Sequence, residues 1–241
     1  MILAVVAVVP VLLRVMPGAD SASGVTTPKD GAFNADAAYA VVDSAGKVFT
    51  FGGAGYRGDT SQITLNAPVV GAIGDPNGGY WFGAADGGIF AFGDAQFYGS
   101  MGGRPLNQPI VGVAATPDGL GYWEVSTTGR VFPYGDAVFA GDTSGLHLNG
   151  VIVGMTPDPV TGGYWLIGSD GGVFSFNAPF FGSTGGIHLN QPVVAMQSTG
   201  DGGGYWFVAS DGGIFAYGDA PFRGSMGGQH LNQPMVGMDG F

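Results

Sequence analysis

The sequence predicts an all-β protein, and three observations support this fold class. One segment recurs five times along the chain, and glycine-rich turns separate its short apolar runs. Glycine accounts for 48 of the 241 residues without the three-residue period of collagen. Aromatic residues account for 12%, which is too many for a disordered chain. The five copies begin at Tyr39, Tyr80, Tyr122, Tyr164 and Tyr205, at spacings of 41, 42, 42 and 41 residues.

The copy that begins at Tyr164 shows how one repeat is built. Tyr164–Gly168 is predicted as a strand that leads through an Asp170-Gly171 turn into a second strand, Val173–Phe176. The Asp-Gly pair adopts the positive φ angles of a two-residue hairpin readily. A glycine occupies this turn in every copy, at Gly46, Gly87, Gly129, Gly171 and Gly212.

Each repeat continues with two further predicted strands. A short third strand is expected around an aromatic residue, which in most copies follows Gly-Asp-Ala or a variant of it. These aromatic residues are Tyr56, Phe97, Phe139, Phe180 and Phe222. A loop with a Leu-Asn pair then leads to the last strand. This last strand begins at Val69, Ile110, Val151, Val193 and Met235.

A period of about forty residues with four strand-like segments is typical of β-propeller blades. The Tyr-Trp strand favours this architecture because it is apolar on both faces. In a propeller each sheet lies between two neighbours, so both faces of its strands are covered. We therefore expect the tryptophans to be packing residues rather than ligand platforms. They are Trp81, Trp123, Trp165 and Trp206.

The two ends of the repeat array predict how many blades form. The first copy opens at Tyr39 without a preceding Val-Val strand, and the last copy ends on Met235-Val236 without a following Tyr-Trp strand. Pairing these two segments would remove the exposed sheet edges. Residues 39–241 are thus predicted to be a five-bladed β-propeller of four-stranded antiparallel blades, with the first blade closed by the C-terminal strand. We expect a monomer; an open fragment that pairs with a second copy is the alternative.

The N-terminal segment predicts export. Residues 2–13 form a run of twelve apolar residues, which is shorter than the ~20 needed to span a bilayer. Small residues follow, as in a secretory signal, although no Lys or Arg precedes the run. We expect residues 1–23 to be a signal peptide or a short N-terminal apolar segment, and residues 24–38 to be a linker. The alternatives are a short membrane anchor and an apolar tail docked on the domain. The predicted location is secreted or at the cell surface, without membrane insertion of the mature domain.

The charge balance excludes one class of partner. Seven Lys and Arg face eighteen Asp and Glu, for a formal net charge of −11. A nucleic-acid-binding protein needs a basic face, and this composition does not supply one. Anionic lipid surfaces are disfavoured for the same reason. The chain has no cysteine, so it forms neither disulfides nor thiolate metal sites.

The repeat resembles a known family. Gly204–Ala220 followed by Leu231–Val236 is similar to the Gly-Tyr-Trp…Ser-Asp-Gly-Gly-Ile-Phe…Gly-Asp-Ala…Leu-Asn-Gln-Pro-Val-Val repeat of secreted actinobacterial proteins. The resemblance covers about residues 39–241 and implies an exported array, found alone or appended to cell-wall hydrolases. A looser likeness is to regulator-of-chromosome-condensation-type repeats and to tachylectin-type five-bladed propellers, which implies architecture only. Ala40, Thr128 and Asn177 depart from the pattern, so five equivalent sites are not implied.

Catalysis and metal binding find little support in the residue pattern. Glu124 is the only glutamate, and glycoside hydrolysis needs a pair of carboxyl groups. Most aspartates recur at turn positions, where they are structural by default. No Asp/Glu pattern at ligand spacing accompanies the three histidines, and no calcium-loop pattern is present. We therefore expect a protein that is not an enzyme and has no cofactor, while calcium binding stays open.

The remaining function is binding. Aromatic, Asn, His and Asp groups repeated around a ring can present several weak sites, which gain avidity on a polymer. We expect an exported, lectin-like propeller that binds a cell-wall or surface ligand, most simply a glycan. The alternatives are a structural or protein–protein interaction scaffold at the cell surface and, third, a glycosidase-like enzyme. The candidate ligand-binding residues are His147, His188, His230, Asn107, Asn149, Asn190, Asn232, Asp94, Asp136 and Asp219.

Overall fold

The computed structural model describes residues 11–14, 39–51 and 54–238. These residues form fifteen strands and no helix, which confirms the predicted all-β class. No helix among them is therefore long and apolar enough to cross a membrane. The predicted linker, residues 24–38, lies outside the described residues, as does most of the predicted signal segment.

The strands make five antiparallel sheets of three consecutive strands each. We call each sheet, with the loop that follows it, a module, and number the modules one to five along the chain. The strands are β1 (Val11–Arg14), β2 (Tyr39–Val42) and β3 (Val48–Phe51); β4 (Val69–Asp75), β5 (Gly79–Ala84) and β6 (Ile89–Gly93); β7 (Ile110–Ala115), β8 (Gly121–Ser126) and β9 (Val131–Gly135); β10 (Ile152–Pro157), β11 (Tyr164–Gly168) and β12 (Val173–Phe176); β13 (Val193–Ser198), β14 (Gly204–Ala209) and β15 (Ile214–Gly218).

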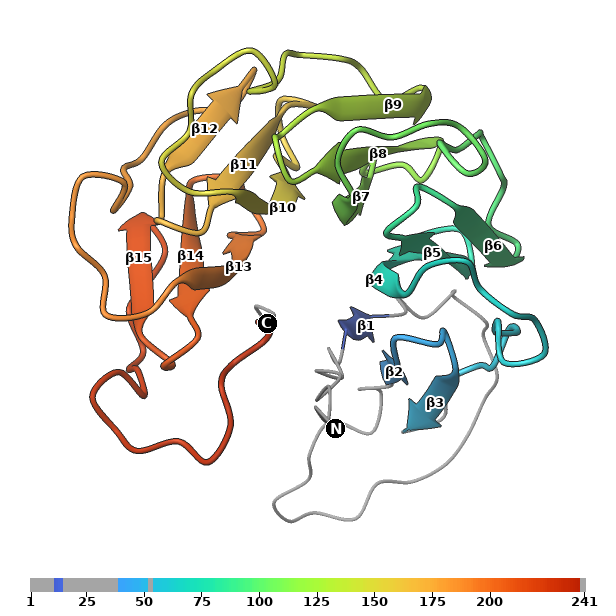
Figure 1. Cartoon of the computed structure of the whole chain (residues 1–241), viewed down its shortest axis with the longest axis horizontal. Coiled ribbons are helices and arrows are strands. Elements are labelled where there is room, and N and C mark those ends of the chain that lie inside the picture. Colours follow the sequence, from blue (N-terminus) through green and yellow to red (C-terminus); the bar gives the residue numbers. More distant parts are fainter. Residues whose placement is uncertain (1–10, 15–38, 52–53, 239–241) are drawn as a thin grey trace, which may run out of the picture.

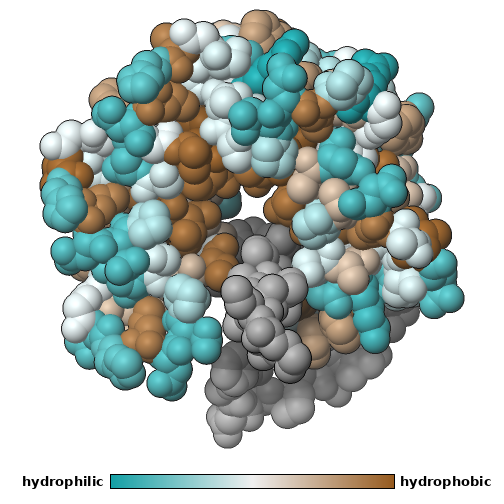
Figure 2. All heavy atoms as spheres, viewed as in Figure 1, coloured by the Kyte–Doolittle hydropathy of each residue, from teal (hydrophilic) through white to brown (hydrophobic). Residues whose placement is uncertain are grey.

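The five sheets follow one another around a common centre (Figure 1). The first strand of each sheet lies nearest the centre and the third strand lies outermost. Successive first strands contact each other from β1 through β4, β7 and β10 to β13. Apolar residues gather toward the centre of this arc, while polar residues dominate its visible face (Figure 2). The sheets of modules one and five are the two ends of this arc, and no described strand lies between β15 and β3 (Figure 1).

The middle strands of modules two, three and four are buried on both faces, as the sequence predicted. Tyr80, Tyr122, Tyr164 and Tyr205 are fully buried, as are Trp81, Trp123 and Trp165. The tryptophan of one module packs on the tyrosine of the next, with ring centroids 5.5 to 5.6 Å apart. These three tryptophans are therefore confirmed as packing residues. Trp206, in the last module, is partly exposed.

Tyrosine hydroxyls join neighbouring modules. The Tyr164 hydroxyl donates to the carbonyl oxygen of Gly141 at 2.6 Å and accepts from the Ala140 N–H at 3.2 Å. Both partners lie in the loop of the preceding module. The same contact recurs in Tyr80 with Gly58, Tyr122 with Gly99, and Tyr205 with Gly182. Burial raises the pKa of all four tyrosines, which keeps their hydroxyls protonated as donors.

The short strand that the sequence predicted around the single aromatic residue of each repeat does not form, which corrects the prediction of four strands per sheet. The segments around Phe97, Phe139, Phe180 and Phe222 form no strand, so the sheets have three strands rather than four. Side chains satisfy the backbone of these segments instead of a neighbouring strand. Trp81 Nε1 donates to the Gln96 carbonyl at 2.8 Å, and the Tyr122 hydroxyl accepts from the Tyr98 N–H at 3.0 Å. A backbone group that is already paired has little to gain from a strand ladder.

The partner of the first Tyr strand also differs from the prediction. β1 pairs antiparallel with β2, with Val11 opposite Val42 and Arg14 opposite Tyr39. Met235-Val236, the predicted partner, forms no strand. A Val/Leu-rich run has high β propensity, and the inner edge of β2 offers unpaired backbone groups, so this run can satisfy that edge. In this structure the end of the N-terminal apolar run is thus a strand docked on the domain. Its removal as a signal peptide stays a prediction.

Tyr164→Phe tests the contact between modules. Loss of the hydroxyl leaves the Ala140 N–H and the Gly141 carbonyl without their partner, so we expect a loss of about 1–3 kcal/mol in the free energy of unfolding. Tyr56→Phe is the matched control because Tyr56 is 58% exposed. Chemical denaturation of both variants measures the difference, and equal stabilities would contradict the assignment.

Gly171→Ala tests the packing of the Asp-Gly turn. Gly171 has φ +76°, and a Cβ there would clash with Thr184 Oγ1. The left-handed conformation alone costs an L-residue roughly 1–2 kcal/mol, and the clash adds to it. Gly186→Ala is the control, since a Cβ there meets nothing within 4 Å and its φ is not positive. A melting-temperature loss confined to Gly171→Ala is expected; similar losses in both variants would be inconsistent with this packing.

Candidate functional site

The predicted binding residues fall into two groups at opposite ends of the sheets. The histidines and asparagines lie on the loops that lead to each first strand. These loops adjoin the turn between the second and third strands, as shown by the hydrogen bond from Ala85 N to the Pro68 carbonyl. The aspartates follow the other end of each third strand, where Gly93 is opposite Gly79. The sequence predicted one composite set; the structure separates it into two.

The histidine group does not converge. His147, His188 and His230 are exposed and occupy equivalent positions in three different loops. In the part of the chain that the structure describes, no three His, Asp or Glu side chains come together as metal ligands would. The asparagines of these loops are also exposed, at Asn107, Asn149, Asn190 and Asn232.

Shallow hollows recur beside the Leu-Asn loops. Two of them flank the loop that carries His188 and Asn190, with volumes of about 320 and 360 Å³. The first also reaches Asn149 in the loop of module three and Asp170 of module four, and the second reaches Asp211 of module five. A hollow of about 340 Å³ occupies the corresponding place in module one, beside Leu65 and Asn66. The repeats therefore place a similar shallow concavity, lined by both polar and apolar residues, at several points of the same face.

The aspartate group takes part in building turns. Asp136 accepts from Thr116 Oγ1 at 3.1 Å, and Asp219 accepts from Thr199 Oγ1 at 3.3 Å. All three predicted aspartates, with Asp94, are exposed. The turn aspartates that the sequence assigned a structural role behave accordingly. For example, Asp170 Oδ1 accepts from the Gly172 N–H at 3.0 Å.

Exposed aromatic side chains form a set that the sequence analysis did not recognise as a site. They are Tyr56, Phe97, Phe139, Phe180 and Phe222, with 58, 54, 53, 60 and 62% of their surface exposed. The sequence analysis assigned these positions to a short strand and gave their side chains no role in binding. Their signal was the single aromatic residue at a constant place in each copy, but a period alone does not tell an exposed aromatic from a buried one.

Glu124 is fully buried in β8, at the position that Phe82, Leu166 and Phe207 occupy in modules two, four and five. Its Oε2 accepts from the Met101 N–H at 3.2 Å, whereas Oε1 has no hydrogen-bond partner among the residues that the structure describes. Burial raises the pKa of Glu124 from 4.5 to about 7; hydrogen bonds from Met101 and Tyr134 oppose this shift, and Asp86 adds to it. The carboxyl is thus an ionisable group inside the packing between modules two and three.

Comparison with protein-family models finds no match to this chain, and comparison with curated proteins finds none either.

Glu124→Gln tests the burial of this carboxyl. Because the folded-state pKa lies above the unfolded one, the wild-type protein loses stability as pH rises from about 4.5 to about 7, by about 3 kcal/mol for this group. We expect Glu124→Gln to remove that part of the pH dependence and to be the more stable protein at pH 8. Asp94→Asn, at an exposed carboxylate, is the control. Thermal melts between pH 4.5 and 8 measure the effect, and parallel profiles for all three proteins would refute it.

Proposed function

We propose that this protein is an exported five-bladed β-propeller that binds a cell-wall or surface glycan at several weak sites. The five consecutive antiparallel sheets around a common centre support the propeller (Figure 1). The resemblance to repeats of secreted actinobacterial proteins supports export, as does the apolar run at the N-terminus.

The observation that carries the proposed binding is the exposed aromatic residue in every repeat. Large apolar side chains that stay in water at the same place in all modules are not explained by core packing. A flat ring offers one face to the apolar face of a sugar, and neighbouring polar groups can bind hydroxyls. In modules two, three and five an exposed aspartate stands three residues before the aromatic, as in Asp94 and Phe97.

Several such sites explain how weak contacts would hold a polymer. A single shallow site binds a small sugar weakly, but linked sites act at high effective concentration when the ligand carries many equivalent units. The hollows beside His188 and Asn190 would add polar contacts on a second face. The acidic net charge of −11 favours a neutral or basic polymer over an anionic one.

A protein partner is the second candidate function. Three of the Leu-Asn loops also expose an aliphatic residue, at Ile63, Leu146 and Ile187, and the last two directly precede a histidine. Exposed aliphatic side chains on the rim of a hollow are typical of protein contact surfaces. Glu124, which the third candidate, a glycosidase, would use, has no exposed surface.

A glycan array with the full chain tests the proposed function. We expect binding to a polymeric wall or surface glycan, and about 10²-fold weaker binding when Phe97, Phe139 and Phe180 are all changed to Ala, because avidity is lost. The matched control changes Val138, Val151 and Val160 to Ala, since these are exposed aliphatic residues outside the aromatic set. Silence of the wild-type chain on all glycans, together with a stable partner in a surface pull-down, would favour the protein-binding alternative.

A further inference from the structure

The same contact joins each pair of consecutive modules. Modules one and five, at the two ends of the arc, each carry one side of this contact without its partner among the described residues. Within the array, the tyrosine of each module bonds a glycine carbonyl in the preceding loop, at distances of 2.5 to 2.7 Å. The corresponding tyrosine of module one, Tyr39, is 42% exposed, and no module of the described residues precedes it in the arc.

The missing half lies at the other end of the chain. The loop of module five carries Gly224 at the place of Gly58, Gly99, Gly141 and Gly182. In those four glycines a Cβ would meet the ring of Phe92, Tyr134, Phe176 and Tyr217, respectively. Gly224 has a similar positive φ, +124°, but a Cβ there would meet no atom of the described residues within 4 Å. Phe51, which corresponds to those four rings in module one, is 47% exposed.

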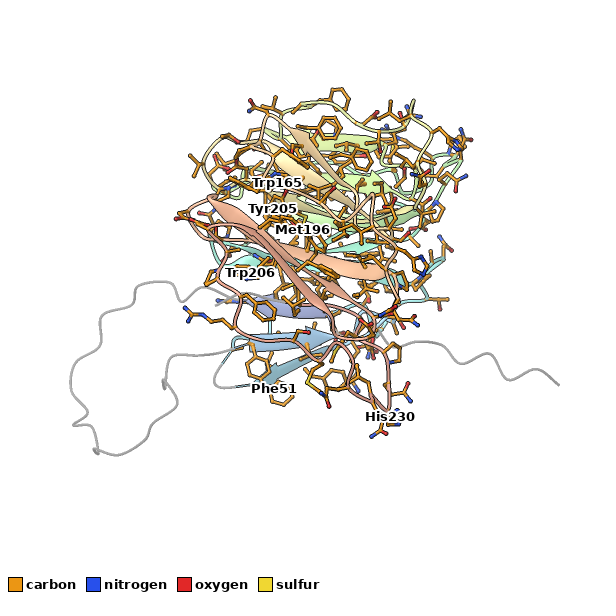
Figure 3. The ribbon with its side chains drawn as sticks, turned by 90° about the vertical axis from the view of Figure 1, so that its left-hand side faces the viewer. Phe51, Trp165, Met196, Tyr205, Trp206 and His230 are labelled. Carbon is orange, nitrogen blue, oxygen red and sulfur yellow. The ribbon has the colours of Figure 1, made fainter. Side chains whose placement is uncertain are left out.

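The tryptophan contact is unfilled in the same way. Trp81, Trp123 and Trp165 each pack on the tyrosine of the following module. Trp206 has no following module in the arc and is partly exposed. Figure 3 shows Trp165 and Tyr205 on one side of the last sheet and Trp206 on the other side, toward Phe51.

The C-terminal segment makes the hydrogen bond with which the first strand of a following module begins. Met235 N donates to the Ser210 carbonyl at 2.8 Å, as Ile152 N does to Thr127 and Val193 N does to Ser169. Ile152 and Val193 begin β10 and β13, the innermost strands of modules four and five. By analogy with Ala195 opposite Val208, Gly237 would lie opposite Val42 on the inner edge of β2. That edge is held by β1 in this structure.

We propose that the first and last modules bind each other through a fifth copy of this contact, within one chain, and that β1 blocks it by holding the edge of β2. When Val11–Arg14 leaves, Met235–Met238 takes its place, Tyr39 bonds Gly224, and Phe51 and Trp206 become buried. The N-terminal segment then acts as a placeholder that keeps the ring open. Closure within one chain is favoured over a second copy because both halves are tethered at high effective concentration. The inference rests on the proposed propeller but not on glycan binding.

Disulfide cross-linking in the full chain tests this proposal, and the absence of natural cysteines gives a clean background. Val11→Cys with Val42→Cys reports that β1 is docked. Val42→Cys with Gly237→Cys reports closure. Leu12→Pro with Leu13→Pro releases β1, because consecutive amides point to opposite sides of a strand and one of the two must face β2.

The expected result is that one disulfide is lost and the other gains when β1 is released. Releasing β1 should abolish the Val11/Val42 disulfide and raise the Val42/Gly237 disulfide within one chain about tenfold, the change that follows from about 1.4 kcal/mol of lost pairing. Gly224→Ala should suppress that disulfide by filling the space that awaits Phe51. Gly228→Ala is its matched control, since Gly228 also has a positive φ and nothing within 4 Å.

Two outcomes would overturn the proposal. One is that no Val42/Gly237 disulfide forms after the Val11/Val42 disulfide has been lost. The other is that the disulfide joins two chains, which would assign the end faces to a second copy. A glycan array without binding would leave the cross-linking result unaffected, so the two failures are distinguishable.

Discussion

The arrangement depends on one repeated constraint: the Tyr-Trp strands of modules two, three and four are covered on both faces by neighbouring modules. In each of them the tyrosine bonds a glycine carbonyl in the loop of the preceding module. In modules three and four it also packs on the tryptophan of that module, as Tyr164 does with Trp123 while it bonds Gly141. The tryptophan of each of these strands bonds the loop that follows in the same module, as Trp165 Nε1 does with the Pro179 carbonyl at 2.7 Å. These contacts use the backbone groups that a fourth strand would have paired. In modules two to four these side chains therefore both join neighbouring modules and pair backbone groups of the loop that follows the third strand.

A contact of this kind has two different halves, so an array of modules leaves one half unfilled at each end. Tyr39 and Phe51 are at one end, and Trp206 and Gly224 are at the other. An exposed tyrosine or tryptophan lacks the burial free energy that its equivalents contribute to folding, ~25 cal/mol per Å² of apolar surface. The exposure of these residues thus has a different origin from that of the five repeated exposed aromatics, Tyr56, Phe97, Phe139, Phe180 and Phe222. Those five aromatics are exposed in every module. Tyr39 and Trp206, in contrast, are exposed although the equivalent tyrosines and tryptophans of the other modules are buried.

The candidate site follows the symmetry of the array only in part. Exposed aromatics occur in all five modules, but the histidines occur in three loops and the aspartates after three of the third strands. Glu124 breaks the symmetry in the interior, where a carboxyl replaces Phe or Leu and one of its oxygens has no partner. Repeats of this type can vary at the rim without loss of packing. A polar group in the interface between modules costs stability unless it is protonated or hydrogen-bonded.

The sequence alone determined the strand class, the five-fold repeat, the burial of the Tyr-Trp strands and the structural role of the turn aspartates, because these depend on local pattern and turn chemistry. It did not determine the number of strands per sheet, since whether the backbone near Phe97 pairs with a strand or with Trp81 and Tyr122 is decided by tertiary contacts. The partner of β2 was equally undetermined: Val11–Arg14 and Met235-Val236 are both apolar runs suited to one edge. The separation of the histidines from the aspartates also required the structure, because strand register, and not sequence distance, sets which ends of a sheet meet.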